Sequence, residues 1–100
     1  SSVDMPKYAT SVRFLVKEGE ADAFMDEAKS IQNVGEMQCV WAKTGDLSFL
    51  VINIFESQQA LLDARPKMIE NLDKCRKYLD EISPELGVTD PVSGPIFCEW

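Results

Sequence analysis

The chain has 100 residues, of which 45% are hydrophobic and 27% are charged. This length and mixture predict one globular domain over residues 1–100, with a single core, and exclude a disordered chain. Ten basic against seventeen acidic residues give a formal net charge of −7. Such a chain repels nucleic-acid phosphates and anionic membrane surfaces, and no apolar run reaches the roughly 18 residues of a membrane span. We therefore expect neither nucleic acid nor membrane as a partner.

Histidine is absent from the sequence. This absence removes Ser-His-Asp and Cys-His catalysis, the usual zinc sites and histidine ligation of haem iron. The three cysteines, Cys39, Cys75 and Cys98, are widely spaced and form no Cys-x-x-Cys pair, which argues against a disulfide framework and a zinc site. Because all three have apolar neighbours, we expect core thiols in a reducing cytoplasm. We expect no metal and no cofactor, and the sequence identifies no catalytic residue.

The first half of the chain predicts a strand, a helix and a hairpin. Alternating apolar residues indicate a strand over Tyr8–Lys17, and apolar residues at helical spacing indicate a helix from Ala21 to near Asn33. Two further strands are expected over Glu36–Lys43 and Leu47–Glu56, joined by a short turn that contains Gly45.

The second half predicts helix followed by strand. Ser57 is the expected N-cap of a helical region that extends to about Ile82. Pro66 interrupts it, so a short helix, a kink or restart, and a longer helix are expected. Residues 87–95 contain two glycines and two prolines and are expected to form a loop, followed by a last strand over Ile96–Trp100.

The order β-α-β-β-α-β is that of the ferredoxin-like split βαβ fold. We expect an α+β domain whose four-stranded antiparallel sheet has the first and third strands in the centre and both helices on one face.

The third strand is apolar on both of its faces, which bears on assembly. One face carries Leu50, Ile52 and Ile54, and the other carries Phe49, Val51 and Phe55. Two helices cover one face of a sheet, and soluble monomers rarely expose a large apolar patch on the other. We expect a homodimer whose sheets pack face to face, with Phe49, Val51 or Trp41 in the interface; the alternative is a monomer with one hydrophobic face.

This pattern resembles the antibiotic-biosynthesis-monooxygenase superfamily of dimeric α+β barrels. The resemblance covers residues 12–100 and includes the pair Phe55-Glu56 at the end of the third strand, with its best local match over residues 53–60. It implies ferredoxin-like subunits that pair through their sheets, each with a pocket between sheet and helices. Some members are cofactor-free oxygenases of polycyclic phenols, others degrade haem, and many have no known activity. Many carry a histidine where this chain has Arg65, so the resemblance disfavours haem degradation.

Five residues are candidates for a ligand site. Asn53 is an amide within the hydrophobic third strand and could bind a ligand oxygen or be satisfied structurally. Arg13 could bind an anion or pair with an acidic neighbour, and Trp41 could stack on an aromatic ligand or anchor the dimer. Tyr78 could reach the mouth of the pocket or pack in the core, and Arg65 could face a cavity or solvent. We expect Asn53, Arg13 and Trp41 to line a cavity on the sheet; the alternative is that this face turns toward the helices and Asn53 is a satisfied core amide.

Three functions remain open at this point. The first is a cofactor-free monooxygenase that acts on a small aromatic substrate of the phenol or quinone type, because an electron-rich phenolate can react with dioxygen itself. The second is a non-catalytic homodimer that binds a small ligand or serves a structural role. The third is a domain whose partner is another protein, since the fold does not determine the function.

Overall fold

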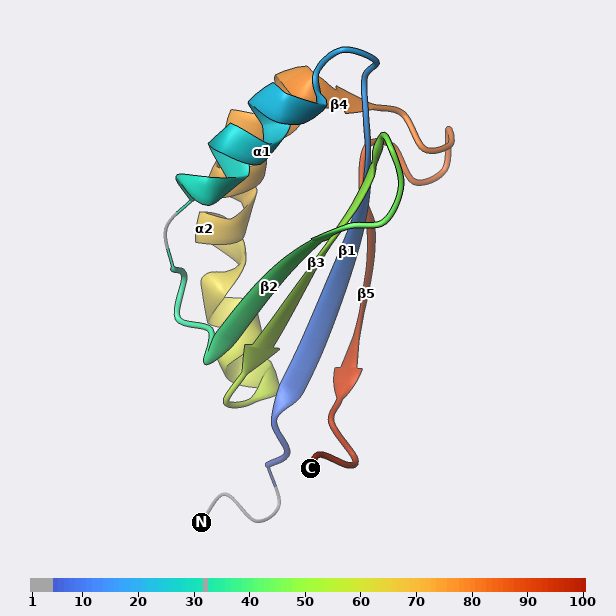
Figure 1. Cartoon of the computed structure of the whole chain (residues 1–100). Coiled ribbons are helices and arrows are strands. Elements are labelled where there is room, and N and C mark those ends of the chain that lie inside the picture. Colours follow the sequence, from blue (N-terminus) through green and yellow to red (C-terminus); the bar gives the residue numbers. More distant parts are fainter. Residues whose placement is uncertain (1–4, 32) are drawn as a thin grey trace.

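A computed structural model describes residues 5–31 and 33–100. The elements follow in the order β1 (Tyr8–Val16), α1 (Ala21–Lys29), β2 (Gln38–Lys43), β3 (Ser48–Phe55), α2 (Gln58–Cys75), a 3-10 turn η2 (Arg76–Tyr78), β4 (Leu79–Asp80) and β5 (Asp90–Pro95). Figure 1 shows one twisted sheet with both helices on the same face. The predicted ferredoxin-like α+β fold is confirmed.

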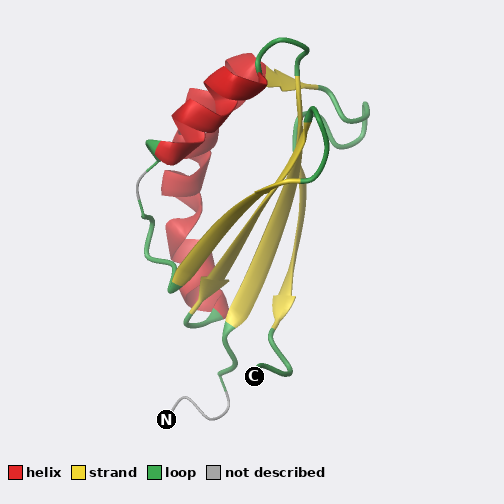
Figure 2. Cartoon of the chain, viewed as in Figure 1, coloured by secondary structure: helices red, strands yellow, loops and turns green. Residues whose placement is uncertain are grey.

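All strand pairs are antiparallel, and the central strands are those expected from the sequence. The order is β2-β3-β1-β4, and β5 pairs with β1 on the same side as the very short β4. Figure 2 shows the sheet and the two helices as separate layers that converge near β4. No helix within the described residues is long and apolar enough to cross a membrane.

The last strand lies earlier in the chain than expected. Asp90–Pro95 pairs with β1 from Tyr8↔Pro95 to Arg13↔Asp90, whereas residues 96–100 form no strand. The N–H of Ile96 donates to the carbonyl of Lys7 at 2.8 Å. Backbone N–H groups alternate in direction along a strand, so the nitrogens of Pro91 and Pro95 point away from β1. An edge strand tolerates proline in this arrangement, because no ladder hydrogen bond is lost.

Helix α2 differs from the expected broken helix. Ser57 caps it as predicted, since its Oγ accepts a hydrogen bond from the backbone N–H of Ala60 at 3.1 Å. Pro66 lies inside one continuous helix, with no restart, and the helix ends at Cys75 rather than near Ile82. Proline removes one intrahelical hydrogen bond. The apolar side of α2 is still buried near both ends of the helix, by Leu61 and Ala64 in one cluster and Cys75 in another, and this packing stabilises the unbroken helix.

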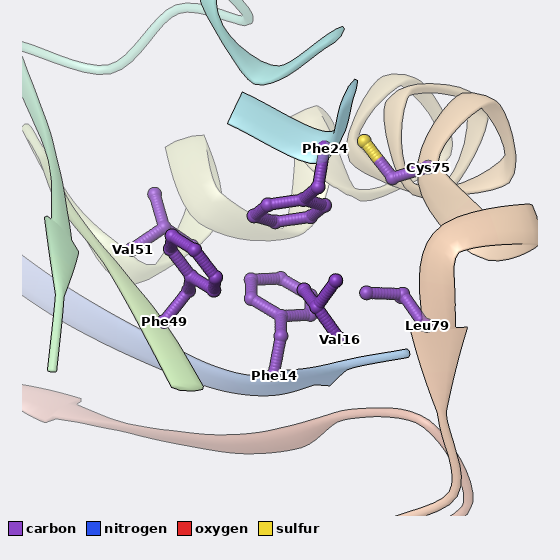
Figure 3. Close-up of a cluster of buried hydrophobic side chains, with 7 residues drawn as sticks. All are labelled: Phe14, Val16, Phe24, Phe49, Val51, Cys75 and Leu79. Carbon is purple, nitrogen blue, oxygen red and sulfur yellow. The ribbon is translucent and has the colours of Figure 1, made fainter. Parts of the chain in front are cut away.

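The hydrophobic core lies between the sheet and the helices, and it contains the face of β3 that we expected in a dimer interface. Phe49 and Val51 are buried with Phe14 and Val16 of β1 beneath Phe24 of α1 (Figure 3). Phe55 belongs to a second buried cluster with Leu61 and Ala64. The sheet-face interface through Phe49, Val51 or Trp41 was therefore a wrong prediction, because alternation points these side chains toward the helices.

The opposite face of the sheet, which we call the outer face, carries the other apolar set. Val40, Ile52 and Val92 are exposed there, and pairing places them in one row with Ser11 between Ile52 and Val92. Leu50 and Ile54 flank this row on β3 and are partly exposed. The apolar excess that the sequence analysis detected is real, but it belongs to the face of Ile52 rather than to that of Phe49.

Two of the three cysteines are not core residues. Cys75 is buried in α2, whereas Cys39 in β2 and Cys98 near the C-terminus are exposed. Apolar neighbours in sequence do not bury a residue on an edge strand, because β2 has no further strand beyond it.

Candidate functional site: a cavity between the sheet and helix α2

A cavity of about 520 Å³ lies between the inner face of the sheet and the helices. Its wall includes residues of β1, β2, β3, β5, α1 and α2, together with residues of the segment 31–36. The lining is mostly apolar, with a few polar groups. This volume and this mixture are typical of pockets that bind small organic ligands.

An aromatic cluster forms one part of the wall. The ring of Trp41 stacks over that of Phe14, with centroids 6.0 Å apart and an interplanar angle of 13°. Trp41 also meets Phe24 edge to face at 6.0 Å and 67°. The indole is half-buried and lines the cavity. It is therefore held in one orientation and presents aromatic surface to a ligand.

A row of polar residues crosses the inner face of the sheet. Cys39 of β2 pairs with Asn53 of β3, Asn53 pairs with Thr10 of β1, and Thr10 pairs with Ser93 of β5. All four residues line the cavity. The rows on either side are dominated by apolar residues, so this polar row is where the sheet can recognise a polar group of a ligand.

Asn53 is the most deeply placed candidate predicted from the sequence. Its side chain is only 7% exposed, and it makes no hydrogen bond with any residue in the part of the chain that the structure describes. By contrast, the equally buried Thr10 donates its hydroxyl proton to the carbonyl of Val92 at 3.3 Å. The amide of Asn53 is not among the fully buried polar groups that lack a partner, so it borders the cavity, where a ligand can reach it.

Among the described residues, one cation and one carboxylate line the cavity, Arg65 and Glu36. Arg65 of α2 lines the cavity but is itself exposed, so it lies at the rim, and Glu36 precedes β2. The carboxylate of Glu36 accepts a hydrogen bond from the backbone N–H of Val34 at 2.9 Å, which holds this acidic group against its own loop.

The thiols at the cavity are protonated at neutral pH. Partial desolvation of the thiol, followed by the nearby carboxylate of Glu36, raises the pKa of Cys39 above its ordinary value. Burial, followed by the charge of Glu27, raises the pKa of the Cys75 thiol to about 11. A thiol must ionise to be a good nucleophile, so neither cysteine is suited to covalent catalysis here.

The structure brings three of the five candidates to the cavity and leaves two outside it. Asn53, Trp41 and Arg65 line the wall, whereas Arg13 and Tyr78 do not. Arg13 lies on the outer face, where its Nη2 is 2.9 Å from Oδ2 of Asp90. Tyr78 lies in η2 and packs against the core cluster of Phe14 and Phe24. The expected grouping of Arg13 with Asn53 was wrong. Arg13 and Phe14 are adjacent in β1 and point to opposite faces of the sheet, and Asn53 is on the face of Phe14.

Sequence reasoning missed Thr10 and Asn71 as lining residues. Thr10 has the same parity as Phe14 and Val16 in β1, and this alternation could have predicted that it points toward the helices. Asn71 is 6% exposed and lines the cavity from α2. It follows Met68 by three residues in the apolar pattern of that helix. Its amide therefore interrupts the apolar pattern of α2, as the amide of Asn53 interrupts that of β3.

No protein-family model and no curated protein matches the sequence, but several solved structures resemble the fold. SnoaB, a cofactor-independent oxygenase from Streptomyces nogalater, is 13% identical with a TM-score of 0.70 over 94% of this chain and 96% of its own. A Nitrosomonas europaea protein provisionally assigned as an antibiotic biosynthesis monooxygenase is 16% identical, with a TM-score of 0.70 over 93% of this chain and 92% of its own.

A dimeric ferredoxin-like protein from an uncultured marine organism is 11% identical, with a TM-score of 0.72 over 97% of this chain and 93% of its own. Identities this low concern the fold and leave the activity open. The chain thus has the ferredoxin-like α+β fold that these structures share, which is the fold that the resemblance described above implied.

Proposed function

We propose that the chain binds a small planar aromatic molecule of the phenol or quinone type in the cavity between the sheet and α2. The observation that carries this proposal is the amide of Asn53, which is 7% exposed in the cavity wall and has no hydrogen-bond partner among the described residues. A ligand oxygen in the cavity would accept a hydrogen bond from this amide. Trp41 offers the aromatic surface against which the ring would pack.

The reaction that we propose for this site is cofactor-free oxygenation of the bound phenol. The ionised substrate gives electrons to dioxygen, and one oxygen atom forms a bond to the ring carbon opposite the hydroxyl. The two hydrogens displaced in forming the quinone leave with the other oxygen atom as water, so the substrate is oxidised and dioxygen is reduced. The contribution of Asn53 would be to stabilise the negative charge on the substrate oxygen.

A second function, binding without turnover, is favoured by a specific observation. Glu36 is the only carboxylate among the described residues that line the cavity, and it already accepts a hydrogen bond from the N–H of Val34. The neighbouring thiols are protonated, as described above. The site therefore offers hydrogen-bond donors more readily than a general base, and a binding protein needs only the donors.

We also propose that two copies pair through their outer faces. Val40, Ile52 and Val92 form an exposed apolar row on that face, and the ferredoxin-like protein from the marine organism, which shares the fold, is dimeric. A two-fold axis would place the same row against itself, which satisfies the requirement that an isologous interface be self-complementary. This face replaces the one predicted around Phe49.

Anthrone, which reacts through its phenolic tautomer, separates the two functions. Calorimetry measures binding of anthrone without oxygen, and an oxygen electrode with product absorbance measures turnover in air. Oxygenase activity predicts one dioxygen consumed and one anthraquinone formed per anthrone, at a rate well above the protein-free background. Binding with no excess oxygen uptake would favour the non-catalytic function. No binding of anthrone or of 2-naphthol would overturn the proposal for this ligand class.

A further inference from the structure

We infer that Arg65 makes the cavity selective for aromatic ligands that carry a carboxylate at the end remote from the oxygen bound by Asn53. This inference rests on the proposed function, because it adds a second recognition point to the same cavity. It concerns the class of ligand and does not depend on whether the ligand is turned over.

The position of Arg65 in α2 is the first observation. Leu61, Arg65, Met68 and Leu72 follow one another at spacings of four, three and four residues, and all four line the cavity. Residues at such spacings share one face of a helix. The face of α2 that looks into the cavity is therefore largely apolar, and Arg65, which is exposed, places a cation at its rim.

The second observation is that Arg65 differs from the other arginines of the chain. The sequence contains three. Arg13 pairs with Asp90 at 2.9 Å, and Arg76 pairs with Asp73 at 2.7 Å. Arg65 forms no ion pair with any acidic residue in the described ranges, and it is the arginine that lines the cavity.

The acidic groups closest to Arg65 in sequence or in the cavity wall have other partners. Oδ1 of Asp63 accepts a hydrogen bond from Nε2 of Gln59 at 2.9 Å. Oε2 of Glu36 is bonded to the N–H of Val34. The guanidinium thus retains its planar set of donors, which matches the two oxygens of a carboxylate.

The negative charge of the whole chain means that an anionic ligand depends on a local cation such as Arg65. With a net charge of −7, the protein repels anions at long range, so an acidic ligand needs a specific local contact to bind. Arg65 projects from α2 and Asn53 from the sheet, on opposite walls of the cavity. A ligand that meets both groups has its carboxylate at one end, an aromatic body in the middle and a hydroxyl or carbonyl oxygen at the other end.

Three probes test this inference. 6-Hydroxy-2-naphthoic acid has a carboxylate and a hydroxyl at opposite ends, its methyl ester removes the charge, and 2-naphthol removes the whole group. Dissociation constants are measured by calorimetry at low and high salt for the native sequence and for Arg65→Gln, Arg65→Lys and Lys67→Gln. Lys67 is the matched control, because it lies on the same helix, outside the cavity, and is paired with Glu70 at 3.7 Å.

We expect the native protein to bind the acid at least about tenfold more tightly than the ester, with salt reducing the difference. Arg65→Gln should abolish this preference and leave the ester and 2-naphthol unaffected, Arg65→Lys should retain part of it, and Lys67→Gln should retain all of it. Equal binding of acid and ester by the native protein, or an equal loss for both in Arg65→Gln, would overturn the role of Arg65 while leaving the cavity as the site. Failure of all three probes to bind would overturn the proposed function as well.

Discussion

Asn53 of β3 lies directly opposite Thr10 of β1 in the antiparallel pairing, yet only the threonine has a hydrogen-bond partner for its side chain among residues 5–31 and 33–100. Both residues point toward the helices and both are almost completely buried. The hydroxyl of Thr10 is satisfied by the carbonyl of Val92 on the next strand. Two polar side chains in equivalent environments therefore have different roles, one in holding β5 to the sheet and one in lining the cavity with an unused amide.

This difference predicts opposite effects for two similar substitutions. Asn53→Leu removes an amide that bonds no other described residue, so the free energy of unfolding should be unchanged or raised, while affinity for 2-naphthol falls about tenfold. Thr10→Val should lower the free energy of unfolding by about 1 kcal/mol, because it removes a hydrogen bond from the β1–β5 pair. Chemical denaturation and calorimetry measure both. A sharp loss of stability in Asn53→Leu with unchanged affinity would show that the amide is structural.

The order of the elements could be read from the sequence, because alternation and helical spacing are local signals. The alternation in β1 identified the face of Phe14 and Val16, and Ser57 identified the start of α2. The last strand was predicted too late in the chain, since Pro91, Gly94 and Pro95 lower the strand propensity of the true segment and only the free edge of β1 makes it a strand. Edge pairing is a tertiary effect that a local window does not contain.

The face assignment of β3 shows a second limit. Both faces of this strand are apolar, so the sequence could not decide whether Phe49 or Ile52 points toward the helices. The same ambiguity affected the prediction of the cavity. Asn53 was correctly placed on the face of Phe49 and Phe55, but the layer that covers this face was predicted to be a second subunit. In the structure that layer is α2, which is why Arg65 and Asn71 join the site and Arg13 does not.

The proposed dimer predicts that a charge on the outer face separates the subunits. Ile52→Asp places a carboxylate in the middle of the apolar row, where a face-to-face interface would desolvate it without a partner. We expect sedimentation of the native protein as a dimer at micromolar concentration, and of this variant as a folded monomer. Leu62→Asp is the matched control, since Leu62 and Ile52 are both 39% exposed but Leu62 lies on α2. A native protein that sediments as a monomer would refute the interface.

The aromatic cluster predicts a large effect of shortening Phe24. Its ring is 1% exposed and contacts Phe49 at 4.9 Å, Phe14 at 5.9 Å and Trp41 at 6.0 Å between centroids. Phe24→Ala should lower the free energy of unfolding by about 3–5 kcal/mol, since it leaves a hole between α1 and the sheet. Phe97→Ala is a control, because this ring is fully exposed in the monomer. Urea denaturation measures the difference, and similar losses in the two variants would contradict the core assignment.

The buried thiol of Cys75 predicts a pH dependence at the alkaline end. Burial raises the pKa of this thiol from 9.0 to about 11, so the folded chain retains a proton that the unfolded chain loses. Between about pH 9 and 11 the unfolded state binds fewer protons, and stability falls as the pH rises. Cys75→Ala should reduce this slope, whereas Cys98→Ala, which alters an exposed cysteine, should not. Melting temperatures across this range measure the slope, and identical slopes in both variants would contradict the prediction.

The two exposed cysteines provide a test of where ligands bind. Cys39 lines the cavity beside Asn53, whereas Cys98 lies outside it near the C-terminus. A saturating concentration of 2-naphthol should slow the alkylation of Cys39 by iodoacetamide about fivefold or more, because a ligand in the cavity covers the thiol. The dissociation constant sets the fraction of protein that is protected in this way. Alkylation of Cys98 in the same sample should be unchanged, which makes it an internal control. Peptide mass spectrometry measures both alkylation rates. If calorimetry shows binding but the two thiols are protected equally, or neither is protected, the ligand binds elsewhere on the molecule.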